Sequence, residues 1–185
     1  MHGDHTRKTS KSAMALFRTK RLTLAIADEM ASLAVRAAQA NSFSPIAVTV
    51  MDPDGNEIVS KRMDGCPPMA YSKLAVAKAN TCVSVQMSTR AYGDKYLKGS
   101  DGVAPSTSDV YVRGLNQIIS VDSGLVAFPG GVLVRDAEGD IVGSVGVSGA
   151  AGDEDEYCAL AAVQECSAAD ELVTEPLEHA LKSEQ

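Results

Sequence analysis

The sequence predicts an α/β domain of the α+β type, in which helices flank an antiparallel sheet of about five strands. Residues 46–51 alternate in a strand pattern and continue through the turn DPDG to a second strand around Ile58. A similar pattern runs from residues 132–134 through DAEGD to residues 141–149. Because strands joined by tight turns pair antiparallel, the two hairpins argue against a doubly wound parallel sheet.

The first helix is expected between residues 22 and 41. Thr23 is a suitable N-cap, and Asn41-Ser42 ends the periodic pattern. Apolar residues recur every three or four positions, as on one face of a helix, and these are Leu22, Ile26, Met30, Leu33 and Ala37.

Turn and glycine chemistry supports both hairpins. Pro53 presets the backbone of the first turn, and Gly55 supplies its positive φ. Gly143, Gly146 and Gly149 lie within the last strand, where a missing side chain indicates that something packs closely on the backbone. A helix is the simplest candidate for that neighbour.

Further helices are expected after the first hairpin. The prolines at 67–68 delay the next helix to residues 69–71, and it should end before Ser88. Ser88-Thr89-Arg90 can cap a short helix that Gly93 is expected to break. Helical spacing predicts one more helix over residues 109–121.

The two ends of the chain carry opposite charge. Residues 1–21 hold six Lys/Arg and one acid, whereas residues 151–185 hold ten acids and one Lys. We therefore expect a basic, disordered N-terminal extension over residues 1–21, with a transit peptide as the alternative. A single domain should span residues 22–168, followed at 169–185 by an acidic tail or weak helix.

Composition excludes several classes of function. Aromatic residues make up 4% of the chain and Trp is absent, which argues against nucleic-acid binding by base stacking. No apolar stretch approaches the length of a membrane span. The four cysteines show no CxxC spacing, which favours reduced thiols and a cytoplasmic protein.

An acidic run, GDEDEY, begins the last expected helix. Asp153 and Glu156 form a D-x-x-E capping pattern for a helix that extends to Ser167. Four adjacent carboxylates could hold a divalent cation at the surface. Acids at a helix N-terminus also complement its dipole, and we favour this interpretation and predict no metal site.

Five segments in order resemble the GlcG/HbpS family of haem-binding and haem-degrading-type domains, which includes the C-terminal domain of PduO-type cobalamin adenosyltransferases. The resemblance covers about residues 22–163. It rests on LTLAIADEMASLAVRAAQ, IAVTVMDPDGNEIVSKRMDG, AYSKLAVAKANT, FPGGVLV and GDIVGSVGVSGAAGDEDEYCALAAV. The resemblance implies a layered α/β domain that forms homo-oligomers and has haem as its leading candidate ligand.

Haem iron usually takes a His, Met, Cys or Tyr side chain as its axial ligand. All three histidines (His2, His5 and His179) lie outside the matched region. A haem site would therefore need a histidine from a tail or a neighbouring subunit, or one of four other side chains: Met63, Cys66, Met69 and Tyr71.

The stretch RMDGCPPMAYSKLAVAKAN could hold an anionic group such as a carboxylate or a haem propionate. Arg62 offers a planar fork for carboxylates, and Lys73 and Lys78 offer point charges. Lys73 and Lys78 lie about 140° apart around a helix, and the resemblance favours Lys78. The alternative is a simple strand-ending turn followed by solvated lysines.

The other candidate site elements are glycines and a thiol. Gly130 and Gly131 of FPGG could present backbone N–H groups to an anion, or could merely allow a tight entry into a strand. Cys66, close to Arg62, is the candidate redox sensor, whereas the other cysteines should pack as small apolar side chains. The predicted cofactor-binding residues are Arg62, Met63, Asp64, Tyr71, Lys78, Gly130 and Gly131.

Three functions remain open at this point. The first is an oligomeric protein that binds haem or a small anionic ligand. The second is an enzyme acting on a small organic acid or carbonyl compound, with Lys78 and Asp64 as charge-handling residues. The third is an accessory subunit without a ligand.

Overall fold

A computed structural model describes residues 20–97, 120 and 124–181 of the chain. These residues form a five-stranded antiparallel sheet with the strand order β2-β1-β4-β3-β5, which confirms the predicted fold class. The strands are β1 (Ala47–Met51), β2 (Glu57–Arg62), β3 (Gly131–Asp136), β4 (Ile141–Ser148) and β5 (Leu172–Glu175). The helix expected at 109–121 lies outside the described residues, except for residue 120.

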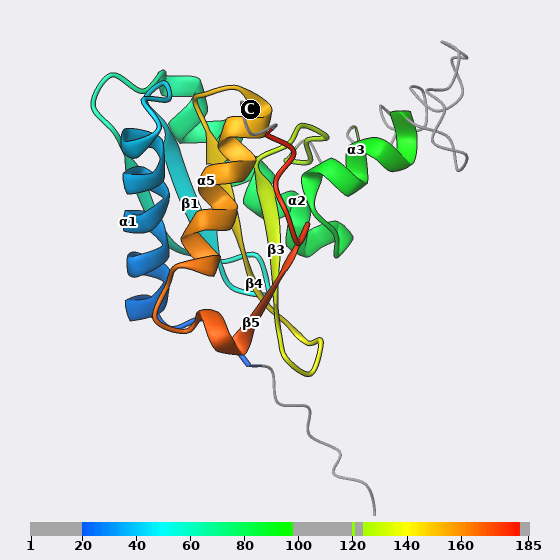
Figure 1. The fold of residues 1–185 in the computed structure, drawn as a ribbon. Helices are drawn as coiled ribbons and strands as arrows, with labels where there is room; N and C mark the ends of the chain where they lie inside the picture. Colours follow the sequence, from blue (N-terminus) through cyan, green and yellow to red (C-terminus); the bar gives the residue numbers. More distant parts are fainter. Residues whose placement is uncertain (1–19, 98–119, 121–123, 182–185) are drawn as a thin grey trace, which may run out of the picture.

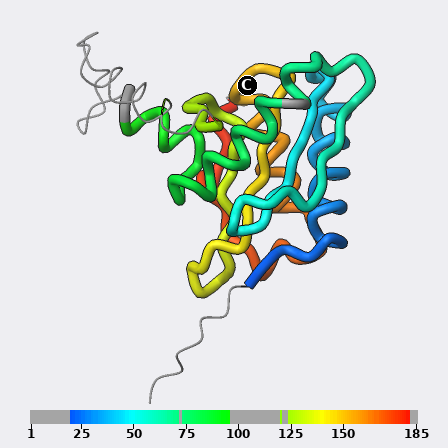
Figure 2. Tube along the Cα trace, turned by 180° about the vertical axis from the view of Figure 1, so that it is seen from behind, coloured from blue at the N-terminus to red at the C-terminus, as the bar shows by residue number. Residues whose placement is uncertain are grey.

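Helices cover both faces of this sheet (Figure 1). On one face lie α1 (Leu24–Ala40) and α5 (Gly152–Gln164). The opposite face, seen in Figure 2, is covered by α2 (Val76–Val85) and by the short π-helix η1 (Ala70–Ala75) that runs into it. The third helix, α3 (Thr89–Leu97), projects away from the body of the domain.

The alternation of side chains along the strands separates two cores. Valines of β1, β3 and β4 pack against α1 and α5 in the larger core: Val48, Val50, Val132, Val134, Val145 and Val147. The intervening residues, among them Ala47 and Leu133, face η1 and α2. The predicted helix face on α1 is confirmed, and the Thr23 hydroxyl accepts a hydrogen bond from the Ile26 N–H as its N-cap.

The close approach of a helix to the last hairpin strand is confirmed at Gly146. A Cβ atom at this position would lie 2.2 Å from the Ala75 carbonyl oxygen and 2.5 Å from the Ala79 nitrogen. The Ser144 hydroxyl, on the same face, donates a hydrogen bond to the Ala79 carbonyl. These contacts fix the η1–α2 segment directly on the backbone of β4.

Two local expectations for the helices are wrong. Gly93 does not break its helix, because α3 continues through it while the missing side chain leaves room for the Ala127 carbonyl. The N-cap of α5 is Ala151 and not Asp153, and the carboxylate that accepts from the N-cap N–H is that of Glu154 and not that of Glu156. The side chain of Asp153 instead forms an ion pair with Arg90.

The structure also differs from expectation at both ends of the domain. Residues 172–175 form the edge strand β5 on β3, where a tail or weak helix was expected. At the other end, Lys20 and Arg21 belong to the body of the domain. Lys20 pairs with Asp136 and Arg21 with Asp52, the first acids of the two hairpin turns. No helix among the described residues is both long enough and apolar enough to cross a membrane.

We expect Gly146→Val to destabilise the fold by about 1–3 kcal/mol or more, because its side chain would overlap the backbone of η1 and α2. Equilibrium unfolding in urea measures this change. Gly152→Ala is the matched control, since the atoms nearest to its added Cβ would be Pro129 atoms at 3.5–3.6 Å, an ordinary van der Waals distance. A Gly146→Val protein as stable as the wild type would contradict the close helix contact.

Candidate functional site

The seven predicted site residues separate into two places on the molecule. Arg62, Met63 and Asp64 line a groove of about 650 Å³ between α1 and the end of β2, which we call the Arg62 groove. Lys78 lines a different cavity of about 510 Å³ at the N-terminus of α5, which we call the Lys78 cavity. Asp64 and Lys78, the charge-handling residues of the enzyme hypothesis, therefore line different pockets.

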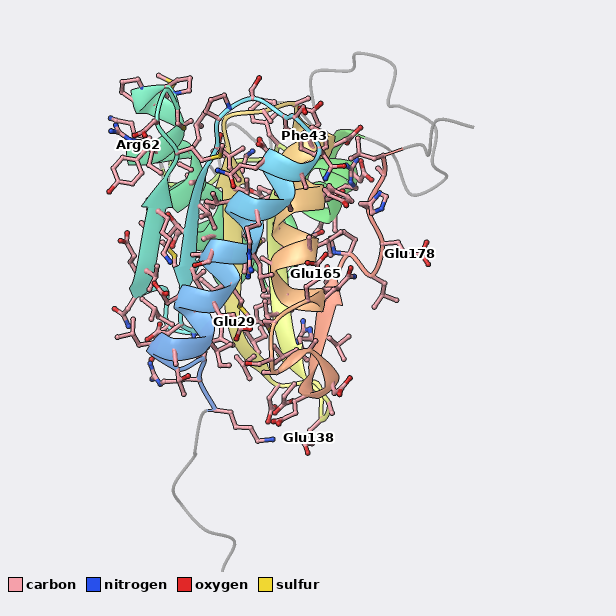
Figure 3. The ribbon with its side chains drawn as sticks, turned by 60° about the vertical axis from the view of Figure 1, so that its left-hand side comes forward. Glu29, Phe43, Arg62, Glu138, Glu165 and Glu178 are labelled. Carbon is pink, nitrogen blue, oxygen red and sulfur yellow. The ribbon has the colours of Figure 1, made fainter. Side chains whose placement is uncertain are left out.

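The walls of the Arg62 groove come from two elements. Ser32, Val35 and Gln39 contribute from α1, and Lys61 to Asp64 contribute from β2 and the turn that follows it. Gly65, with φ of +81°, turns the chain away at this point. Figure 3 shows Arg62 at the end of the molecule opposite Glu138, far from the two hairpin turns.

The two cations of the groove differ in their partners. Lys61 pairs with Asp28 at 2.8 Å and donates to the Ser32 hydroxyl, so its charge is already compensated. Arg62 lies over the Tyr71 ring, with its guanidinium carbon 5.4 Å from the ring centroid. Within the described part of the chain, no carboxylate pairs with Arg62. Its charge is therefore available to an anionic group.

Met63 is the thioether of the groove. Its side chain is half-buried and packs against the larger core. The sulfur accepts a weak hydrogen bond from the Ile46 N–H at 3.4 Å, which occupies one of its two lone pairs. The other lone pair remains for a ligand.

Lys78 is buried, with 4% of its surface exposed. Its ammonium donates to the Val147 carbonyl and to Asp155 Oδ2, both at 2.8 Å. Burial lowers the pKa of Lys78 and raises the pKa of the Asp155 carboxyl, and the attraction between the two groups offsets part of each change. Lys78 and Asp155 thus form a buried ion pair in the cavity wall.

FPGG is part of this arrangement, but it is not an anion cradle. A Cβ at Gly130 would lie 2.7 Å from Lys78 Nζ, so the glycine makes room for the lysine. The Gly131 N–H is taken by the Thr89 hydroxyl at 2.9 Å. The anionic ligand expected at Lys78 and the two glycines would also meet the negative charge of Asp155.

The acidic run of α5 is divided among several roles. Asp155 pairs with Lys78, and the fully buried Glu156 binds Arg90 through both carboxylate oxygens at 2.9–3.0 Å. Burial of two of these acids excludes the solvated surface cluster that could hold a cation. Among the described residues, no group of three or more metal-ligating side chains could hold a metal ion.

Cys66 lacks the properties of a reactive thiol. It is buried, and burial raises the pKa of its thiol despite the nearby Arg62. The sensor interpretation is therefore not supported. Cys82, Cys158 and Cys166 are also buried with raised pKa values, about 12 for Cys158, as expected for small apolar packing residues.

Comparison with known proteins identifies the family. A model of the family described as "Haem degrading protein HbpS-like" matches residues 22–164. The chain belongs to the HbpS-like family. No curated protein sequence matches it.

Solved structures of HbpS-like proteins share the fold. A structure of HbpS is 27% identical with a TM-score of 0.66, and the match covers 85% of this chain and 98% of HbpS. A PduOC:haem complex is 27% identical with a TM-score of 0.62, covering 77% of this chain and 92% of PduOC. The structure of the Klebsiella pneumoniae protein ORFY is 22% identical with a TM-score of 0.66, and the match covers 82% of this chain and 94% of ORFY. At this identity the similarity supports the fold alone.

Sequence reasoning missed the carboxylates that this HbpS-like chain buries. Asp155 and Glu156 lie in a run of four acids, in which residue type alone does not distinguish the buried members from the exposed ones. The period of α5 offers one signal, because Glu156 falls four positions before the buried Leu160. Sequence alone could not indicate Lys78 and Arg90 as their partners.

Lys78→Met should destabilise the protein by about 3–5 kcal/mol, because it leaves the Asp155 carboxylate buried without its cation. The double variant Lys78→Met/Asp155→Leu should recover most of that loss, since it removes both charges. Urea unfolding of the two variants and the wild type measures the difference. Equal destabilisation by the single and double variants would contradict a buried ion pair.

Proposed function

We propose that this HbpS-like chain binds haem and that the Arg62 groove holds it. A haem carries two carboxylates on an otherwise apolar ring. Arg62 presents a guanidinium that pairs with no carboxylate among the described residues, and Val35 and Met63 supply apolar wall. The observation that carries the proposal is this available cation at a groove of about 650 Å³.

Among the candidate iron ligands, Met63 fits the groove best. Met69 is 64% exposed and does not line the groove. The thiol of Cys66 is buried with a raised pKa, which disfavours the thiolate that binds iron. Tyr71 faces Arg62 and is not part of the groove wall. His179 packs edge-on against the Tyr157 ring, with centroids 4.9 Å apart. Met63 lines the groove and keeps one lone pair for the iron.

The family supports haem as the ligand, and one of the similar structures is a haem complex. The residue types of the groove suit haem, because Arg62 offers a cation for a propionate and Met63 offers a thioether for the iron. The homo-oligomer expected from the resemblance stays a proposal, which light scattering of the purified protein checks.

Titration with hemin, followed at the Soret band in the ferric and dithionite-reduced states, tests this function. We expect saturation at one haem per chain. Met63→Leu should remove the spectral signature of thioether ligation, and Arg62→Gln should weaken binding about tenfold or more by removing a charged hydrogen bond. Thermal unfolding verifies that both variants are folded.

Met69→Leu and Arg36→Gln are the matched controls, because both residues are exposed and lie outside the groove. Neither should change the titration. Binding that does not saturate would rule out a defined haem site. Loss of the signature in Met69→Leu or Tyr71→Phe, with Met63→Leu unaffected, would move the site to the outer face of η1.

A further inference from the structure

The Lys78 cavity contains hydrogen-bond donors that no described residue accepts. An ammonium has three N–H donors, and Lys78 directs two of them to Val147 and Asp155. No acceptor for the third is found among the residues that the structure describes. Lys78 lines the cavity, and its two hydrogen bonds at 2.8 Å hold the ammonium group in place. The third N–H donor is therefore held at the cavity wall.

Ser148 provides the second donor. This residue is buried, with 4% of its surface exposed, and lies at the end of β4 on the face that carries Ser144 and Gly146. Its hydroxyl makes no hydrogen bond to any described residue, although it belongs to the cavity wall. Because this hydroxyl lines the cavity, it can donate a hydrogen bond to an oxygen atom of a ligand bound there.

The charges around the cavity disfavour an anionic ligand. Lys78 is neutralised by Asp155, and the guanidinium of Arg90 is shared between Asp153 and Glu156. Two cations therefore face three carboxylates, and the balance is negative. An added carboxylate would be repelled, whereas a neutral oxygen acceptor would not.

The outer part of the cavity is apolar. Leu74 from η1 and the segment Phe128-Pro129 line it, and Phe128 is 68% exposed. An exposed aromatic side chain beside a cavity with buried donors suits a ligand that has a polar end and an apolar body. The volume of about 510 Å³ is that of a small-molecule site.

We propose that the Lys78 cavity is a binding site for a small neutral carbonyl compound, such as a ketone, aldehyde or amide. The carbonyl oxygen accepts hydrogen bonds from Lys78 and Ser148, and the apolar part lies against Leu74, Phe128 and Pro129. This site is separate from the Arg62 groove and does not depend on haem binding.

Three six-membered-ring probes that differ in their polar group test the proposal on the haem-free protein. They are cyclohexanone, cyclohexanecarboxylate and cyclohexylammonium. Backbone amide resonances of Ala150, Ala151 and Gly152, which line the cavity, report binding in 1H–15N spectra. Cyclohexanone labelled with 13C at its carbonyl reports hydrogen bonding through the shift of that carbon.

We expect cyclohexanone to shift these amides saturably and to bind at least tenfold more tightly than the carboxylate or the ammonium probe. Ser148→Ala should raise its Kd about threefold to tenfold, as expected for the loss of one hydrogen bond. Ser84→Ala is the control, because that exposed hydroxyl bonds to Asn80 on α2. It should leave the Kd unchanged.

The double variant Lys78→Met/Asp155→Leu should reduce the carbonyl shift, because Ser148 alone then donates to the carbonyl, while the amides keep a folded spectrum. If that variant does not fold, the Kd of cyclohexanone for Ser148→Ala alone tests the proposal. Tighter binding of cyclohexanecarboxylate would overturn the proposal in favour of an anion site. Equal binding of all three probes, or an unchanged Kd in Ser148→Ala, would also overturn it.

Discussion

The contact between Lys78 and Asp155 joins more of this domain than any other single interaction described above. The ammonium belongs to α2, one acceptor to the C-terminal end of the strand β4, and the other to the start of α5. Elements on both faces of the sheet are therefore tied together at one end of β4. Since each charge is buried, each depends on the other, and neither element can move without exposing an unpaired ion.

This pairing explains the small residues around it. Gly130 leaves the space that the Lys78 ammonium fills, and Gly146 lets the helix carrying Lys78 lie on the backbone of β4. Gly131 is similarly close to the Lys78 carbonyl and the Cys82 sulfur. The glycine-rich sequences that resemble an anion-binding loop thus serve a close-packed lysine. Glycines in a sequence look the same whether they bind an anion or make room for a lysine, and only the packing in the structure distinguishes the two roles.

Local chemistry made the two hairpins predictable from sequence. The turns after β1 and β3 contain Gly55 and Gly139 at positive φ. Both faces of β1 and β4 are buried, and their alternating valines lie on the face that packs against α1 and α5. Strand β5 was missed because four residues, LVTE, between acidic segments carry no periodic signal, and pairing with β3 decides their conformation.

The candidate site could be predicted in its residue types but not in its arrangement. Arg62, Met63 and Asp64 are adjacent in sequence and stay together in the groove. Lys78 was expected to join them as a second cation, but its partner Asp155 lies 77 positions away in the sequence and cancels its charge. Charge compensation between distant residues is a tertiary property, and it decides which cation an anion can reach.

The winding of η1 explains why the two sites are distinct although their residues come from one short segment. In a π-helix, residues five apart lie close to the same face, and Ala70 and Ala75 both face the sheet. Tyr71 and Leu74 then fall on opposite sides of that buried face. Tyr71 reaches Arg62, whereas Leu74 lines the Lys78 cavity. One turn of helix therefore separates the Arg62 groove, whose arginine pairs with no carboxylate in the described part of the chain, from a cavity whose charges are paired. The two should select ligands of different charge.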